Sequence, residues 1–181
     1  MKASEAIMHM RFYLADSQKV KYSDDALLSA LNLAVTLSFE TFIGYASSLG
    51  RKQTTITLTD GVGDLPADFH SIALVEDASG EEVLPDYAKV TPASGYYKVV
   101  GDKIYSNADS LVLEYHYIPT AIADISSEID CPESMTGQLV LVAVNIAKGD
   151  RMGADNAIYN MVRALASRSI PYVPDRKAFQ R

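Results

Sequence analysis

The sequence predicts an α+β fold in which helices from both ends of the chain pack together around a strand-rich middle. Apolar residues recur every three or four positions at residues 23–49 and 154–169, whereas residues 51–122 show alternation and turn motifs. The first pattern is typical of helices that bury one face, and the second of half-buried strands. Neither helical half is expected to bury its apolar stripe alone. We therefore expect a four-helix base made from the N- and C-terminal helices, with an inserted β-rich subdomain.

The bulk properties set the expected domains. We expect a discontinuous helical domain over residues 1–50 and 123–170, an inserted β-rich subdomain over 51–122 and a C-terminal arm over 171–181. The 181 residues are 48% apolar and 22% charged, as in ordinary globular proteins with a real core. No run of 18 uncharged apolar residues occurs, so we expect no membrane span. The single cysteine, Cys131, excludes an internal disulfide framework and favours a reducing cytoplasm.

The first two helices are expected over residues 4–17 and 23–49. The first has a mixed apolar face and is only weakly amphipathic. Ser23 can cap the second helix, two aspartates follow in its first turn, and Gly50 can end it. This second helix carries additional apolar residues beyond its main stripe, namely Leu33, Leu37 and Ile43. Such a helix is expected either at the centre of the core or at a subunit interface.

The middle of the chain is expected to form short strands. Alternation or apolar runs predict strands near residues 54–58, 72–75, 96–100, 103–105 and 111–118. Gly101 can take the positive φ that a two-residue hairpin turn requires. Five of the eleven tyrosines fall in these strands (Tyr96, Tyr97, Tyr105, Tyr115 and Tyr117), where they can serve either cross-strand packing or a protein interface.

The last two helices are expected over residues 133–148 and 154–169. Asp130 followed by Glu133, with Pro132 between them, indicates a helix start. Gly149 and Gly153 bracket a tight connection between the two helices. Nearly continuous apolar sequence predicts that the third helix is buried.

Charge is distributed unevenly along the chain, whose net charge is −7. Residues 161–181 hold five basic residues and one acidic residue, a net charge of +4, whereas residues 1–160 hold 11 basic and 22 acidic residues, a net charge of −11. An acidic body argues against tight nucleic-acid binding, because phosphate contact needs a cationic face. The basic, proline-containing end is expected to be either an arm that seeks an acidic partner or a solvated tail.

No motif in the sequence indicates catalysis. His9, His70 and His116 lack the spacing of zinc ligands, and the Gly-Val-Gly at residues 61–63 lacks the Lys-Ser/Thr end of a phosphate loop. Cys131 has no histidine near it in the sequence and is followed by proline. We therefore expect no enzymatic activity, no cofactor and no bound metal.

One enzymatic alternative stays open at this point. A small metal-dependent hydrolase or nuclease could assemble its site from distant carboxylates such as Asp64, Asp68 and Glu114. Stabilisation of the fold by a divalent metal ion would favour this alternative.

The order of several motifs resembles the head-to-tail connector (adaptor) proteins of short-tailed bacteriophages. The motifs are Tyr-Ser-Asp-Asp-Ala-Leu-Leu at 22–28 with Leu31 and Asn32, Leu-Pro-Ala-Asp-Phe at 65–69, the hairpin at 97–104, and Leu-Glu-Tyr-His-Tyr-Ile-Pro at 113–119. Together they span most of the chain. The chain has no tryptophan, and Phe39 and Phe42 take the place of aromatics that relatives often carry in the second helix.

This resemblance implies a structural role in the virion, in a protein assembled in the host cytoplasm. Members of the family form rings, commonly of twelve copies, under the portal protein, extend the DNA channel and offer a platform for the tail or nozzle protein. DNA would pass through without specific binding, and no membrane is involved. The resemblance also implies that the C-terminal arm engages the portal, with contact candidates Pro171, Tyr172, Val173, Pro174, Arg176, Lys177 and Phe179. Another neck or tail-completion protein of the virion is the nearest alternative.

Overall fold

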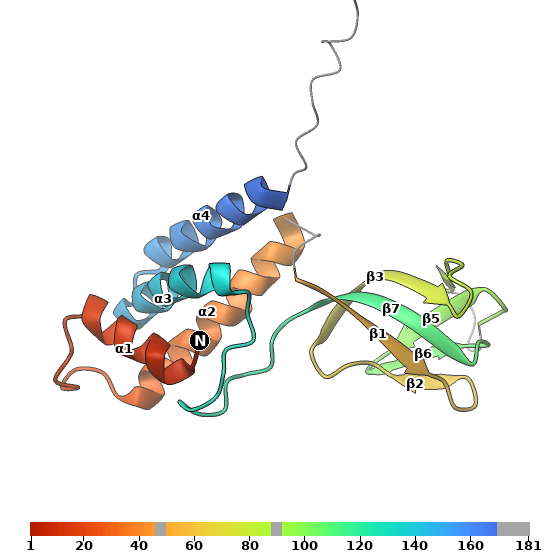
Figure 1. Cartoon of the computed structure of the whole chain (residues 1–181), viewed down its shortest axis with the longest axis horizontal. Helices are drawn as coiled ribbons and strands as arrows, with labels where there is room; N and C mark the ends of the chain where they lie inside the picture. Colours follow the sequence, from red (N-terminus) through yellow and green to blue (C-terminus); the bar gives the residue numbers. More distant parts are fainter. Residues whose placement is uncertain (46–49, 88–91, 170–181) are drawn as a thin grey trace, which may run out of the picture.

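The computed structural model of the chain describes residues 1–45, 50–87 and 92–169. Within these residues the protein is mixed α+β, with four helices and two sheets (Figure 1). The helices are α1 (Ala3–Tyr13), α2 (Asp24–Tyr45), α3 (Glu133–Lys148) and α4 (Arg151–Ser169). The strands are β1 (Arg51–Thr57), β2 (Val62–Asp64), β3 (Phe69–Asp77), β4 (Leu84–Pro85), β5 (Tyr96–Val100), β6 (Lys103–Ser106) and β7 (Ser110–Tyr117).

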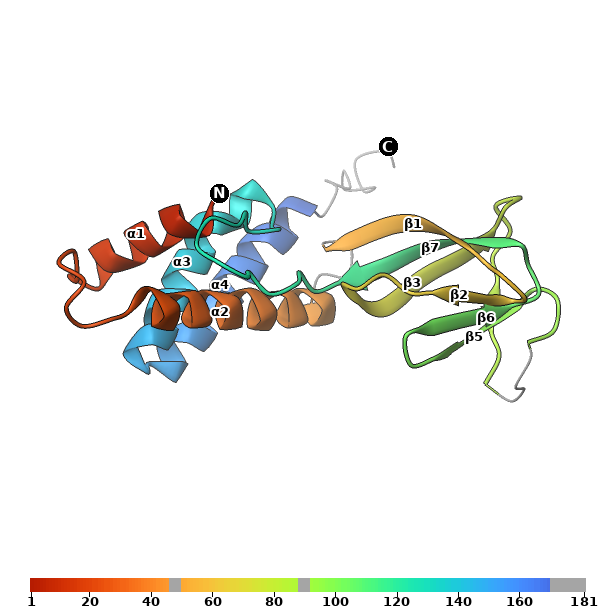
Figure 2. The same cartoon turned by 90° about the horizontal axis from the view of Figure 1, so that it is seen from below.

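The helices lie together at one end of the molecule and the strands at the other, as both views of the ribbon show (Figures 1 and 2). α2 packs along α3 and also contacts α4, while α3 packs against α4 and α1. Along α2 and α3, the side chains of Leu31, Phe39 and Leu139 are at most 1% exposed. Helices from the two ends of the chain thus bury their apolar faces against one another.

The helix ends agree with the sequence in some places and differ in others. The Oγ atom of Ser23 accepts a hydrogen bond from the backbone N–H of Ala26 at 3.1 Å, as expected of a cap at the start of α2. Gly149 takes the left-handed conformation, with φ +74°, and ends α3. Gly153, however, lies inside α4, which begins at Arg151. α3 begins at Glu133 as expected, but its N-cap is Pro132, which makes no side-chain cap hydrogen bond. Asp130 lies two residues before this N-cap, and its carboxylate binds Lys52.

The first helix is shorter than expected. α1 ends at Tyr13, and the chain turns at Ala15 and Lys19, both of which have positive φ. The carboxylate of Asp16 organises this turn, because it accepts hydrogen bonds from three backbone N–H groups, those of Val20, Lys21 and Tyr22. These bonds give the chain a preferred path between α1 and α2, and they end the helix earlier than apolar periodicity alone indicates.

The strands form a three-stranded sheet, ordered β1-β7-β3, and a four-stranded sheet, ordered β2-β6-β5-β4. β1 and β3 both pair antiparallel with β7, while β5 and β6 form the hairpin predicted around Gly101, whose φ is +62°. The two sheets bury a shared set of apolar side chains that includes Ile104, Leu111 and Leu113. β2 approaches β1 so closely that a Cβ atom on Gly63 would collide with Ile56.

Among the described helices, α2 is long and apolar enough to cross a membrane by length and composition alone. A buried core helix meets the same criterion, and α2 is packed against α3 and α4. We interpret it as a core helix. Two of its large apolar side chains, Leu33 and Tyr45, are exposed, at 47% and 73%.

Candidate functional site: a junction cluster and three uncovered surfaces

The portal-contact candidates predicted from the sequence lie outside the described residues. Pro171, Tyr172, Val173, Pro174, Arg176, Lys177 and Phe179 all follow residue 169, where the described part of α4 ends. They remain predictions. The candidate site is therefore built from the described residues.

A polar cluster joins the helices to the strands. We call Lys52, Asp68, Tyr115, Tyr117 and Asp130 the junction cluster. The Nζ atom of Lys52 binds the carboxylates of Asp68 at 2.7 Å and Asp130 at 2.9 Å. The hydroxyl of Tyr115 donates to Asp68 at 3.0 Å. Because its members come from β1, the β2–β3 loop, β7 and the segment before α3, the cluster ties four parts of the chain together.

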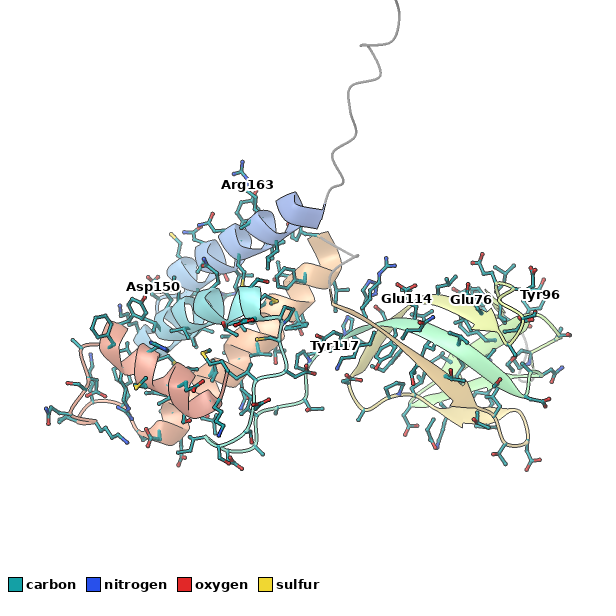
Figure 3. The ribbon with its side chains drawn as sticks, in the orientation of Figure 1. Glu76, Tyr96, Glu114, Tyr117, Asp150 and Arg163 are labelled. Carbon is teal, nitrogen blue, oxygen red and sulfur yellow. The ribbon has the colours of Figure 1, made fainter. Side chains whose placement is uncertain are left out.

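Tyr117 connects this cluster to the helical core. Its ring lies under the Lys52 ammonium, 3.9 Å from the ring centroid, and packs against the Phe39 ring of α2 with 5.2 Å between centroids. Figure 3 shows Tyr117 at the boundary between helices and strands. The ring of Tyr117 thus makes a direct contact between β7 and the C-terminal half of α2.

The electrostatics of the cluster favour the ion pair. Burial opposes ionisation of Asp68, but hydrogen bonds from Lys52 and Tyr115 outweigh it and lower the pKa of this carboxyl. Burial also works against the charge on Lys52, yet its two carboxylate partners raise the pKa of the ammonium. Burial and the hydrogen bond to Asp68 raise the pKa of Tyr115 to about 12. At neutral pH Lys52 and Asp68 are charged and Tyr115 is neutral.

Alkaline pH should weaken the fold through Tyr115. In the folded protein the pKa of the Tyr115 hydroxyl is about 12, against an ordinary value of 10.0. The stability that comes from this pKa difference is therefore fully present below pH 10 and is lost as pH rises through about 12. We expect the midpoint of urea unfolding to fall over this window. In the variant Tyr115→Phe the unfolding midpoint, measured by circular dichroism, should fall less steeply with pH. Tyr87→Phe, at an exposed position, is the control. Identical pH slopes for all three proteins would contradict the assignment.

A second polar network is buried beneath α1. Arg11 is 5% exposed, and its guanidinium binds the carboxylates of Asp16 at 2.8 Å and Asp24 at 2.6 Å. It also donates to the carbonyl of Tyr22 at 3.0 Å. The network fixes the α1–α2 loop against the start of α2, which gives it a structural role.

The carboxylates of the enzymatic alternative do not converge. Asp64 pairs with Lys103, Asp68 with Lys52, and Glu114 with Arg51. No group of three or more His, Cys, Asp or Glu side chains in the described part of the chain could hold a metal ion. Each of the three acids is thus engaged by a different cation in this structure.

The remaining candidates for chemistry are His116 and Cys131. The Nδ1 atom of His116 lies 3.2 Å from the Ser71 hydroxyl on the neighbouring strand. Burial raises the pKa of the Cys131 thiol to about 11, so little thiolate forms at neutral pH. The raised pKa therefore argues against Cys131 as a reactive thiol.

Three surfaces expose apolar side chains. The α1 patch comprises Met8, Phe12, Tyr13 and Ile125, which are 42–79% exposed; three of them line a hollow of about 460 Å³, and Tyr13 packs edge-on against Phe12. The helical groove, about 330 Å³, is lined by Leu33, Leu37, Ile146, Gly149, Arg151, Ala154 and Asp155. The strand groove, about 310 Å³, is lined by Phe69, Ile72, Pro85, Asp86, Tyr87, Tyr97, Lys98 and Val99. Contiguous apolar surface of this kind is typical of docking sites.

The strand tyrosines divide between the two roles left open by the sequence. Tyr115 and Tyr117 are buried in the junction cluster, whereas Tyr96 is 40% exposed at the far strand end (Figure 3). Tyr97 is half-buried and lines the strand groove. Packing therefore accounts for the tyrosines near the helices, and those at the opposite end are available for contact.

Neither a protein-family model nor a curated protein matches this chain.

Proposed function

We propose that this protein is a structural head–tail adaptor of a short-tailed bacteriophage. In this proposal residues 1–50 and 123–170 form a four-helix base that docks under the portal ring, and residues 51–122 form an inserted β-rich subdomain that receives the tail or nozzle protein. Copies assemble as a ring, by family resemblance of twelve, and extend the DNA channel. The protein performs no catalysis.

The observation that carries this proposal is the placement of uncovered apolar surfaces at both ends of the molecule. The α1 patch and the helical groove lie on the helical end, and the strand groove lies on the strand end (Figure 1). An adaptor has to hold different neighbours at separate places on its surface. The junction cluster supports this role, because its ion pairs and hydrogen bonds connect the helical end to the strand end. A neighbour that fixes one end would thereby fix the orientation of the other.

The charge distribution supports passage of DNA without binding. Residues 1–160 carry a net charge of −11, so most of the ring wall would repel phosphates. The β-rich residues 51–122 alone hold 11 acidic and five basic residues. A ring with such a wall would let DNA slide, whereas a cationic wall would retain it.

Electron microscopy of this protein mixed with candidate portal rings tests the proposal directly. We expect a collar of density under the portal, with the helical end nearest the portal and the strand end pointing away from it. A portal ring that stays bare at saturating adaptor concentration, for every short-tailed phage portal tried, would reject the proposal.

Removal of the C-terminal arm should separate folding from attachment. We expect deletion of residues 170–181 to leave a folded monomer, because the buried side chains of the described core all precede residue 163, and to abolish binding to the portal. Sedimentation of the truncated chain with portal rings and its circular dichroism spectrum provide the two measurements. A variant with only Arg176→Gln and Lys177→Gln is the matched control for charge. Retention of the truncated chain on the portal would disprove the arm's role.

A further inference from the structure

The sequence that follows α4 carries two prolines three residues apart. Pro171 and Pro174 are followed, two positions later, by Arg176, and we call residues 171–176 the proline segment. A polyproline II helix has three residues per turn and rises about 3.1 Å per residue, so its two prolines would share one side, about 9 Å apart. Segments of the form Pro-x-x-Pro bind aromatic-lined grooves, because proline has little conformational freedom to lose. The segment lies beyond the described residues, and its sequence alone makes it a candidate ligand.

The strand groove offers matching aromatic walls. It is about 310 Å³ in volume, and its lining includes the aromatic side chains of Phe69, Tyr87 and Tyr97. Phe69 and Tyr97 are half-buried, whereas Tyr87 is 89% exposed. The Phe69 ring packs against the Tyr115 ring of the junction cluster, with 6.0 Å between centroids, so one wall of the groove is held in place. Proline rings bind to aromatic walls of this kind.

A strongly acidic turn borders the strand groove. Residues 76–82, from the end of β3 toward β4, hold four acidic residues and no basic residue. Burial raises the pKa of Tyr97, and the Tyr87 hydroxyl and the Glu82 carboxylate raise it further, so Glu82 lies close to the groove. A cation that follows a docked proline segment would meet this carboxylate.

The other two uncovered surfaces have no such excess of acid among their described lining residues. The helical groove is lined by one acid and one base, and the exposed Lys148 and Asp150 beside it add one of each. The hollow of the α1 patch is lined by two bases and one acid. In the lining of the strand groove Asp86 and Lys98 balance one another, so its acidity comes from residues 76–82. The strand groove is therefore the best match for a basic segment.

The charge of the whole chain favours the same pairing. Residues 51–122 hold 11 acidic and five basic residues, a net charge of −6. The net charge is −1 for residues 1–50, with five acidic and four basic residues, and −2 for residues 123–169, with six acidic and four basic residues. Residues 170–181 hold three basic residues and one acidic residue, a net charge of +2. The basic end of the chain is thus attracted to the strand end more than to the helical end.

α4 ends away from the strand groove of its own chain. Pro171 follows the last described residue, Ser169, by two positions, so it lies at most about 7 Å from it. α4 packs against α2 and α3, and in both views of the ribbon it ends on the helical side of the molecule, away from β5 (Figures 1 and 2). A neighbouring copy, whose approach this short connection does not limit, is the better source of the groove.

We propose that the proline segment of one copy docks in the strand groove of a neighbouring copy. The two prolines pack against Tyr87 and Tyr97, and the guanidinium of Arg176 faces Glu82. The inference goes beyond the proposed function, because it gives the C-terminal arm a binding site in the free protein, before any portal is met. One consequence rests on the proposed function: a portal that takes the arm would open the strand groove to the tail protein, so the portal would bind before the tail.

Binding of a peptide to the full-length protein tests the groove. A fluorescent peptide of residues 170–181 is titrated with a full-length chain that carries Pro171→Ala and Pro174→Ala, whose own arm would not compete. We expect saturable binding in fluorescence anisotropy, weakened on the order of tenfold when Tyr87→Ala is added to the protein. Tyr45→Ala, at a position 73% exposed on the helical end, is the matched control and should bind like the parent chain. Equal binding by the Tyr87→Ala and Tyr45→Ala chains, or none at millimolar protein, would overturn the proposal.

Changes in the peptide test the recognition chemistry. Replacement of both prolines by alanine should also weaken binding on the order of tenfold. Arg176→Glu in the peptide should weaken it about fivefold, and Glu82→Lys in the protein should restore it. A peptide without prolines that binds as tightly as the natural one would overturn the proposed recognition of proline.

Disulfide trapping distinguishes docking between copies from docking within one chain. In a Cys131→Ser background, a Val173→Cys chain mixed with a Tyr87→Cys chain should give mixed crosslinks under oxidation. Tyr13→Cys, at an exposed position on the helical end, replaces Tyr87→Cys in the control mixture. A chain with both cysteines should form dimers and larger oligomers, whereas closure within single chains alone would overturn the exchange between copies. Neither experiment uses a portal, so a portal that stays bare would leave this contact standing.

Discussion

Replacement of Arg11 by methionine should lower the free energy of unfolding by about 3 kcal/mol, because it breaks a buried ion-pair network from one side. Arg11 is 5% exposed, and its guanidinium binds two carboxylates and the backbone carbonyls of Tyr22 and Asp16. Methionine fills much of the same volume but offers no donor, so Asp16 would lose its cation while staying covered by the loop. Urea unfolding followed by circular dichroism gives the measurement.

Lys19→Met is the matched control for this prediction. Lys19 reaches the same Asp24 carboxylate, at 3.4 Å, but its side chain is 64% exposed. An exposed pair of this kind contributes less than about 1 kcal/mol, so the control should unfold nearly as the wild type does. Equal losses of unfolding free energy in the two variants would show that the buried Arg11 ion pairs stabilise the fold no more than the exposed Lys19 ion pair does.

The Arg11 network also predicts an acid dependence. The backbone N–H of Lys21, with further hydrogen bonds and the Arg11 charge, lowers the pKa of Asp16 despite its burial, and the Arg11 side chain does the same for Asp24. A lowered pKa contributes stability above the ordinary value of 3.8, and this stability is lost as pH falls through the lower value. The Arg11→Met variant should therefore lose less stability than the wild type between pH 4 and the acid limit.

The mixed α+β fold could be predicted from the sequence because its elements follow local rules. The apolar stripe of α2 and its Ser23 cap indicated the helix start, and Gly101 indicated the β5–β6 hairpin, all as observed. The predictions failed where a contact with a residue distant in the sequence determines the local structure. Asp130 followed by Glu133 suggested a cap, but the N-cap of α3 is Pro132, and the Asp130 carboxylate binds Lys52, 78 residues away.

The candidate site was much less predictable than the fold. Arg11 could have been noticed, because it is a cation on the apolar side of a short helix. Lys52 carried no such signal: it follows the expected end of a helix, where basic residues are common. The helical groove combines residues from α2, α3 and α4, so only the packing of the helices brings Leu33 near Ile146. The excess of apolar residues in α2 was visible in the sequence, but their neighbours were not.

Replacement of Phe39 by alanine should have the largest effect of all, a loss of about 3 to 5 kcal/mol in the free energy of unfolding. Phe39, in the C-terminal half of α2, is 1% exposed and packs against Phe42 at 6.1 Å and Tyr117 at 5.2 Å between ring centroids. Its removal leaves a cavity between the helices and the end of β7. Tyr45→Ala, an aromatic truncation in the same helix at a position 73% exposed, should cost well under half as much.

The same residue tests whether helices and strands are mechanically connected. A double-mutant cycle of Phe39→Ala with Tyr117→Leu should give a coupling energy of about 0.5 to 1.5 kcal/mol, because the two rings contact each other directly. Loss of this contact leaves Lys52 with its two carboxylates but removes the aromatic link from Tyr117 to α2. Limited proteolysis between β7 and α3, residues 118–132, should then accelerate in Phe39→Ala more than its lowered stability explains. Additive effects in the cycle would mean that this ring contact does not couple the strands to the helices.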